Sequence, residues 1–60
     1  MKMTINAMNV QVGDLVCGYH KIVKNVEIIG SGQAIVITFE DGTETTSCKA
    51  WDITVIRTAR

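Results

Sequence analysis

The sequence predicts an all-β domain in which five short strands close into a small barrel. Three observations lead to this fold class: Val, Ile and Thr are frequent, strand-like runs alternate with glycine-containing turns, and the pair Asp41-Gly42 joins two such runs. An Asp-Gly pair between alternating hydrophobic residues is the strongest short-range signal of a hairpin. Closure of the sheet would also protect the strand edges of so short a chain from aggregation.

Size, charge and composition restrict the possible functions. The 60 residues form one domain with a small core, because a chain of this length buries only about 60% of the surface that it exposes when unfolded. Six Lys and Arg balance six Asp and Glu, so the net charge favours neither nucleic acid nor an acidic membrane surface as a partner. No apolar run reaches the about 18 residues of a membrane span, and residues 1–9 lack the apolar block of a signal peptide. We therefore expect a cytoplasmic protein.

The first strand is expected to follow a short lead-in. Residues 1–9 show no clear period, which predicts a partly ordered lead-in to a small barrel that spans residues 10–60. Alternation in residues 10–12, followed by a Gly-Asp turn, predicts a short first strand at residues 15–17. The next connection is expected at residues 18–20.

The second strand is the longest one that the sequence predicts. It covers residues 21–29, and its apolar alternation changes phase near Lys24, which indicates a bulge or a strong bend at that point. The run of small residues at 30–32 is typical of a tight turn, and it leads into a third strand that begins at Gln33 or Ala34.

The third and fourth strands are predicted to form a hairpin around Asp41 and Gly42. With these two as the loop residues, a type I′ turn requires φ > 0 at both, which Asp tolerates and Gly adopts without steric cost. The resulting register would place three pairs on the inner side of the hairpin: Phe39 with Glu44, Ile37 with Thr46, and Ile35 with Cys48.

The last strand is expected at residues 53–57. Residues 49–52 interrupt the strand pattern, and four residues are enough for one turn of 3₁₀ helix before that strand. The expected inner positions are Val12, Leu15, Cys17, Val26, Ile28, Ile35, Ile37, Phe39, Ile53 and Val55. The apolar residues expected to point outward are Val16, Val23, Ile29, Val36 and Ile56, and so much outward apolar surface favours self-association.

The sequence resembles a known type of small barrel protein. The residues that carry the resemblance are Val12-Gly13-Asp14-Leu15-Val16, Val26, Val36-Ile37-Thr38-Phe39-Glu40-Asp41-Gly42 and Asp52-Ile53-Thr54-Val55. With five short strands, a long bent second strand and a one-turn helix before the last strand, this pattern is similar to SH3-like or Tudor-like barrel proteins encoded in bacterial and bacteriophage genomes. Its motifs are turns and core positions, so the resemblance implies a fold rather than an activity.

The cysteines and the histidine do not form a convincing chemical motif. Cys17 and His20 have the spacing of one pair of zinc ligands, but the second pair, Cys48 and Asp52, lacks it. Two reduced thiols that behave as small apolar groups are the simpler interpretation, and they also make a disulfide the less favoured alternative. A barrel of this size has little room for a catalytic pocket, so we expect neither an enzyme nor a bound metal or other cofactor.

Two aromatic residues are the candidates for a binding site. In SH3-like barrels the ligand face is commonly built from the connection after the first strand and from the short helix before the last, and the resemblance implies that Tyr19 and Trp51 lie in these two places. Tyr and Trp offer large, rigid apolar surfaces with a polar group, which suits binding interfaces. The alternative, in which Trp51 closes one end of the core and Tyr19 covers it, is about equally compatible with so small a domain.

Four basic residues, Lys21, Lys24, Lys49 and Arg57, could border Tyr19 and form a basic, aromatic strip for single-stranded nucleic acid. Scattered surface cations on a neutral domain are the simpler interpretation. We therefore expect a non-catalytic interaction module that binds a partner protein or another copy of itself. A nucleic-acid-binding accessory protein and a phage-type inhibitor of a host enzyme are the alternatives, and no membrane partner or small-molecule substrate is expected.

Overall fold

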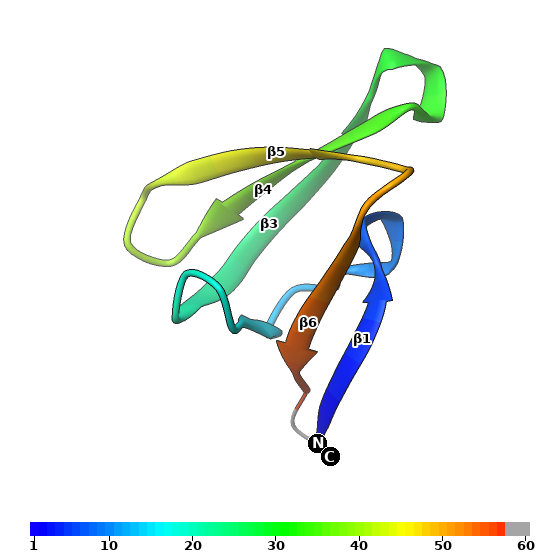
Figure 1. Cartoon of the computed structure of the whole chain (residues 1–60). Helices are drawn as coiled ribbons and strands as arrows, with labels where there is room; N and C mark the ends of the chain where they lie inside the picture. The colour runs from blue at the N-terminus through cyan, green and yellow to red at the C-terminus, as the bar shows by residue number, and fades with distance from the viewer. Residues whose placement is uncertain (58–60) are drawn as a thin grey trace.

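The computed structural model describes residues 1–57 and shows an all-β domain, as predicted from the sequence (Figure 1). Its six strands are β1 (Lys2–Asn6), β2 (Leu15–Val16), β3 (Lys21–Ile29), β4 (Ala34–Phe39), β5 (Glu44–Cys48) and β6 (Asp52–Ile56), with 3₁₀ turns η1 (Ala7–Asn9) and η2 (Gly30–Gly32). All pairings are antiparallel, in the order β1-β6-β2-β3-β4-β5. No pairing joins β1 to β5 in the described residues, so the sheet has two outer strands. None of the described residues belongs to a helix of the length and apolar character that crossing a membrane requires.

The sixth strand comes from the segment that the sequence analysis treated as a lead-in. Within residues 1–9, β1 pairs with β6 over its whole length, and Met3 and Ile5 pack against the core. Asn6 then ends the strand, because its side chain accepts a hydrogen bond from the Met8 amide and starts η1. Only two apolar residues alternate in this strand, which is too short a pattern to distinguish from an irregular segment.

Strand β3 is bent, and its two ends pair with different neighbours. The register with β4 shifts between Val23 and Asn25, which confirms the bulge predicted near Lys24. Before the bulge β3 pairs with β2, and after it β3 pairs only with β4. The bulge turns Val23 into the core, where it is fully buried, whereas the prediction had placed it on the outside.

The β4–β5 hairpin forms, but its register differs by one residue from the prediction. The Phe39 amide donates to the Thr43 carbonyl at 2.8 Å, so the loop has three residues instead of two, and of these only Gly42 has a positive φ, of 89°. The Asp41 carboxylate stabilises the longer loop by accepting hydrogen bonds from the Thr43 hydroxyl at 2.6 Å and amide at 2.9 Å. These bonds, together with that from Lys21, lower the pKa of Asp41 to about 2.

The one-residue shift changes which residues of β5 lie opposite the core residues of β4. The prediction that Ile35, Ile37 and Phe39 point inward is confirmed. Their neighbours across the hairpin are Ser47, Thr45 and Thr43, where Cys48, Thr46 and Glu44 had been predicted. Inner and outer faces of β5 are therefore exchanged relative to the prediction.

The connection between β5 and β6 is a turn, so the prediction of a 3₁₀ helix at residues 49–52 is wrong. One hydrogen bond closes this turn, from the Trp51 amide to the Cys48 carbonyl at 3.1 Å. The carbonyls of the segment are bonded to the N-terminal region instead, since Asn6 Nδ2 donates to Lys49 O at 2.7 Å and the Ala7 amide donates to Trp51 O at 2.9 Å. These bonds hold the chain extended as it enters β6.

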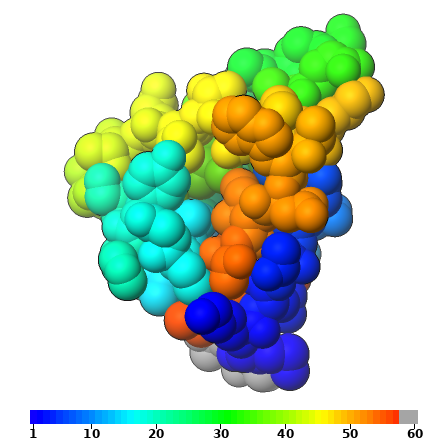
Figure 2. Space-filling model, in the orientation of Figure 1, coloured from blue at the N-terminus to red at the C-terminus, as the bar shows by residue number. Residues whose placement is uncertain are grey.

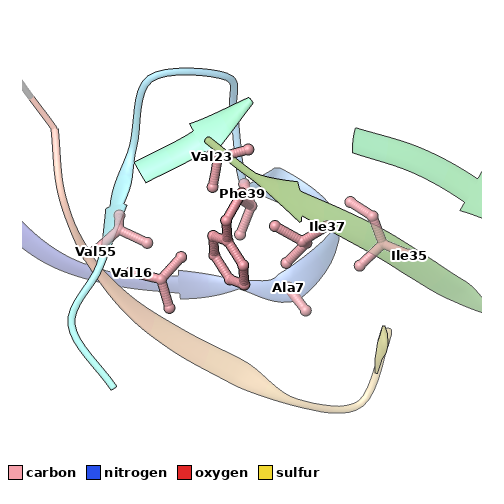
Figure 3. Packing of buried hydrophobic residues seen from close by; sticks show 8 residues of the cluster. Ala7, Val16, Val23, Ile35, Ile37, Phe39 and Val55 are labelled. Atoms are coloured by element: carbon pink, nitrogen blue, oxygen red, sulfur yellow. The ribbon is translucent and has the colours of Figure 1, made fainter. Parts of the chain in front are cut away.

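Phe39 lies at the centre of a compact apolar core (Figure 3). The buried hydrophobic residues are Ala7, Val10, Val16, Val23, Ile35, Ile37, Phe39 and Val55. Met3, Ile5, Met8, Val26 and Ile53 pack around them and are partly buried. The prediction of inner positions is therefore confirmed at Ile35, Ile37, Phe39 and Val55, while Leu15, Cys17, Val26 and Ile53 are half-buried.

Two predicted inner residues are exposed, and two predicted outer residues are buried. Val12 is 62% exposed while Val16 is buried, because Gly13 adopts a φ of 96° and interrupts the alternation between them. Ile28 is 60% exposed, because the β3–β4 hairpin extends beyond the core at its η2 end (Figure 1). Val23 is buried by the bulge described above.

A buried ion pair joins the chain before β2 to the chain after β6. Asp14 is almost fully buried, and its carboxylate accepts hydrogen bonds from Arg57 at 2.8 and 2.9 Å and from the Gln11 amide at 3.0 Å. The Arg57 hydrogen bond is the main cause that lowers the pKa of Asp14, and it outweighs burial, which raises it. Arg57 is thus held by a buried carboxylate and is not a free surface cation.

Replacement of Arg57 by Met should lower the free energy of unfolding at pH 7 more than replacement of the exposed Lys24 by Met, because it leaves the Asp14 carboxylate buried without its partner. The wild-type pKa of Asp14 is below its unfolded value, so the ion pair stabilises the fold above about pH 4 and less as the pH falls. The difference between the two proteins should therefore narrow toward pH 3. Urea unfolding at pH 7 and pH 3 measures this difference in the free energy of unfolding, with Lys24→Met as the control. A difference that does not depend on pH would contradict the ion-pair explanation.

Candidate functional site

A surface pocket of about 370 Å³ opens between the β2–β3 connection, β5 and the start of β6. These three segments, cyan, yellow and orange, converge on the face of the molecule shown in Figure 2. The pocket is lined by Val16, Gly18, Tyr19, Ile37, Thr45, Thr46, Ser47, Trp51, Asp52, Ile53 and Thr54. Val16 and Ile37 are core residues, so the floor of the pocket is apolar and rigid.

Tyr19 forms one wall of the pocket. The amides of Tyr19 and His20 both donate to the Val16 carbonyl, at 3.2 and 2.8 Å, which makes the β2–β3 connection a tight turn. The Tyr19 ring packs on Phe39 with ring centroids 5.4 Å apart, and its hydroxyl lies 3.1 Å from Thr45 Oγ1. The side chain is fixed at both ends although the residue is 52% exposed.

Trp51 also lines the pocket. Its amide and carbonyl are fixed by the turn from Cys48 and by the Ala7 amide, whereas the residue is 60% exposed. Trp51 is not among the partly buried residues that pack around the core. The indole is therefore presented to solvent from a backbone that is held in place, which agrees better with the prediction of a binding residue than with its alternative, closure of the core.

The remaining lining residues are mainly hydroxyl-bearing. Thr45, Thr46 and Ser47 come from β5, and Asp52 is the one charged side chain among the described lining residues. Within residues 1–57, no His, Cys, Lys or Arg lines the pocket. Aromatic walls, an apolar floor and several hydroxyls suit the binding of apolar side chains with polar groups beside them.

The sequence analysis missed the contribution of β5. The two-residue loop that it assumed placed Thr46 and Cys48 on the inner side of the hairpin, which left Thr45 and Ser47 on the outer side. In the structure Thr45 and Ser47 are opposite Ile37 and Ile35 and share their inner face. A preference for a three-residue loop, which Thr43 two positions after Asp41 favours, would have identified them.

The four predicted basic residues lie outside the pocket lining. Lys21 forms an ion pair with Asp41 at 3.0 Å, donates to Thr43 Oγ1 at 2.8 Å and lies 5.7 Å from the centre of the Phe39 ring. Arg57 is bonded to Asp14, and Lys24 and Lys49 are exposed. None of the four lines the pocket.

The residues considered for metal binding are separate in the structure. Cys17 and Cys48 are free thiols, each half-buried. Within residues 1–57 no three His, Cys, Asp or Glu side chains are grouped in a way that could hold a metal ion. His20 is exposed, with a φ of 56° that the turn after β2 imposes.

Comparison of the chain with protein-family models, with curated proteins and with solved structures found no match. The function proposed for the protein is therefore inferred from the geometry and chemistry of its pocket.

Replacement of Trp51 by Ala should leave the free energy of unfolding within about 0.5 kcal/mol of the wild type, because the indole is mostly exposed. Ile37→Val, which removes a single methylene from the buried core, should cost about 1 kcal/mol. Urea unfolding of both variants, followed by far-ultraviolet circular dichroism, makes the comparison. A larger loss for Trp51→Ala than for Ile37→Val would show that Trp51 supports the core.

Proposed function

We propose that the protein is a non-catalytic interaction module that binds a partner protein through the pocket between Tyr19 and Trp51. One observation carries the proposal: two aromatic side chains, each more than half exposed and each on a fixed backbone, meet in one pocket over a buried apolar floor. Tyr and Trp are the residues that most often supply the binding energy of protein interfaces. Because the Tyr19 ring is already held by Phe39 and Thr45, little of its side-chain entropy is lost on binding.

We further propose that the domain is a small barrel of the SH3-like type with one added strand. Strands β2 to β6 are arranged in the order β6-β2-β3-β4-β5, and the long β3 bends between its two neighbours, which fits such a barrel. The additional strand, β1, pairs with β6. On the side where backbone pairing is missing, the contact between Tyr19 and Thr45 links the β2–β3 connection to β5.

A protein partner is favoured over a nucleic acid by the distribution of charge. Lys21 and Arg57 are held by carboxylates, and Asp52, which lies in the pocket lining, would repel phosphate. The zero net charge supplies no general attraction for a polyanion. The apolar floor and aromatic walls instead match apolar side chains of a protein.

Affinity capture from a host lysate, with and without nuclease, tests this function. Trp51→Ala and Tyr19→Ala should each abolish the capture of a discrete protein by the wild type, and nuclease should not affect it. Val12→Ala is the matched control, because Val12 is equally exposed but lies outside the pocket lining. Capture that nuclease abolishes would favour the nucleic-acid alternative, and capture unchanged by both aromatic substitutions would refute a role for the pocket.

Self-association is a second candidate function, and the outer edge of β3 favours it. Beyond the bulge β3 pairs only with β4, so the register leaves the amides and carbonyls of Val26 and Ile28 pointing away from the sheet. Ile28 is 60% exposed, and Ile29 beside it is also exposed. An unpaired strand with exposed apolar side chains is a surface on which a second copy could add.

If β3 mediates self-association, the apparent mass in sedimentation equilibrium should rise with protein concentration, and Ile28→Lys should return the protein to a monomer. Glu44→Lys introduces the same side chain on β5 and should leave the association unchanged. A monomer at all concentrations up to the millimolar range would exclude this candidate without affecting the proposal for the pocket.

A further inference from the structure

Strand β5 has an unpaired outer edge that adjoins the pocket. Hydrogen-bonded pairs alternate along an antiparallel ladder, and the bonds from Phe39 to Thr43 and from Lys49 to Gln33 fix their phase between β4 and β5. Thr45 and Ser47 therefore direct their amides and carbonyls toward β4. The amides and carbonyls of Glu44 and Thr46 point away from β4, and they form no hydrogen bond with any other described residue.

Apart from the charged residue Glu44 at its start, the edge of β5 lacks the usual protection against strand addition. Edge strands are commonly blocked by Pro, by a bulge or by a Lys within the strand. Strand β5 has a regular register with β4 and contains neither Pro nor Lys, whereas the other outer strand, β1, begins with Lys2. The outer edge of β5 is therefore open to a further strand.

The register determines which side chains an added strand would direct into the pocket. A residue paired with Thr46 through both of its outward groups would place its own side chain on the outer face, as Thr46 does. Its two neighbours would lie beside Thr45 and Ser47, on the inner face that lines the pocket. Two side chains spaced two residues apart would thus enter the space between Tyr19 and Trp51.

We infer that the partner binds as an extended segment that adds antiparallel to β5 and places two apolar side chains, two positions apart, in the pocket. This inference rests on the proposed function and specifies the chemistry of its ligand. Hydrogen bonds to Glu44 and Thr46 would hold the main chain, and the aromatic walls would select apolar side chains. Glu44 at one end of the edge and exposed Lys49 beyond the other favour a basic C-terminal and an acidic N-terminal end in the segment.

A second copy of the chain is a poorer occupant of this edge. Another β5 would direct Thr45 and Ser47 into the apolar pocket, and β3 would direct Glu27 toward Asp52. Strand β1 has apolar residues at the required spacing, Met3 and Ile5, but they already pack against their own core. The segment that fits is therefore one from a different protein.

The probe for this inference is the peptide acetyl-Glu-Thr-Val-Thr-Val-Thr-Lys-amide, titrated into the ¹⁵N-labelled protein and followed by NMR. Binding should shift the amide resonances of Glu44 and Thr46 and slow exchange of their protons with solvent. The control peptide acetyl-Glu-Thr-Val-Val-Thr-Thr-Lys-amide has the same composition, but its adjacent valines point to opposite faces of a strand. The affinity of the control peptide should be lower than that of the alternating peptide by about fivefold or more.

A synthetic 60-residue chain with N-methylated Thr46 removes one outward donor and leaves every side chain in place. Its thermal unfolding should match that of the wild type, while its affinity for the alternating peptide should fall by about fivefold or more. Thr46→Pro offers a recombinant equivalent, because Pro is tolerated where the amide of an edge strand faces solvent. Thr46→Ala then measures how much of the loss comes from the side chain, which lines the pocket, rather than from the amide.

Each remaining outcome contradicts the inference in a different way. Failure of the alternating peptide to bind at millimolar concentration, or shifts confined to the pocket without slower exchange at Thr46, would overturn strand addition. Partner capture that is lost with Trp51→Ala but kept with Thr46→Pro would leave the proposed function intact and refute the extended mode of binding. Changes at Glu44 and Thr46 that depend on protein concentration alone would assign the edge to a second copy.

Discussion

Burial of Phe39 is the interaction on which the rest of the structure depends. It is the largest fully buried side chain, and it lies where β4 meets the first half of the bent β3. Val23 reaches it only because the bulge turns that residue inward, and Tyr19 and Lys21 lie against its ring from the surface. One aromatic residue therefore links the core to the wall of the pocket. A change in packing around Phe39 would therefore be transmitted to Tyr19.

The Asp14–Arg57 ion pair adds a polar interaction to the apolar contacts that hold the fold together. Buried charges cost free energy unless they are paired and bonded, and here Arg57 and the Gln11 amide satisfy both carboxylate oxygens. The pair connects the turn before β2 to the residue after β6, so it fixes the relative position of two segments that are distant in sequence. The floor and one wall of the pocket depend on these segments.

Most strands of the fold were predictable from the sequence. The register of the β4–β5 hairpin and the choice of which side chains face the core in β3 and β5 were not. Alternation in β4 identified Ile35, Ile37 and Phe39 as inner residues, because three large apolar side chains at every second position of one regular strand must all face the same side of the sheet. The loop length at Asp41 depends on side-chain hydrogen bonds to Thr43, which no hydrophobic pattern records, and the exposure of Ile28 depends on where the core ends. Tyr19 and Trp51 were predicted by the resemblance, and the structure does bring them into one pocket. The part played by β5 was missed because it follows from the register alone.

The central place of β6 between β1 and β2 has a consequence for how the chain folds. Strand β1 is synthesised before the other five strands, yet the strand with which it pairs in the described residues, β6, is the last of the six. The β3–β4–β5 hairpins are local and can form while the chain is still leaving the ribosome, but β1 must wait with its main-chain groups unpaired until residues 52–56 emerge. Contacts between such distant segments close slowly, because the entropy of a long loop must be lost before they form. The sheet is thus completed in one late step that captures both ends of the described chain together.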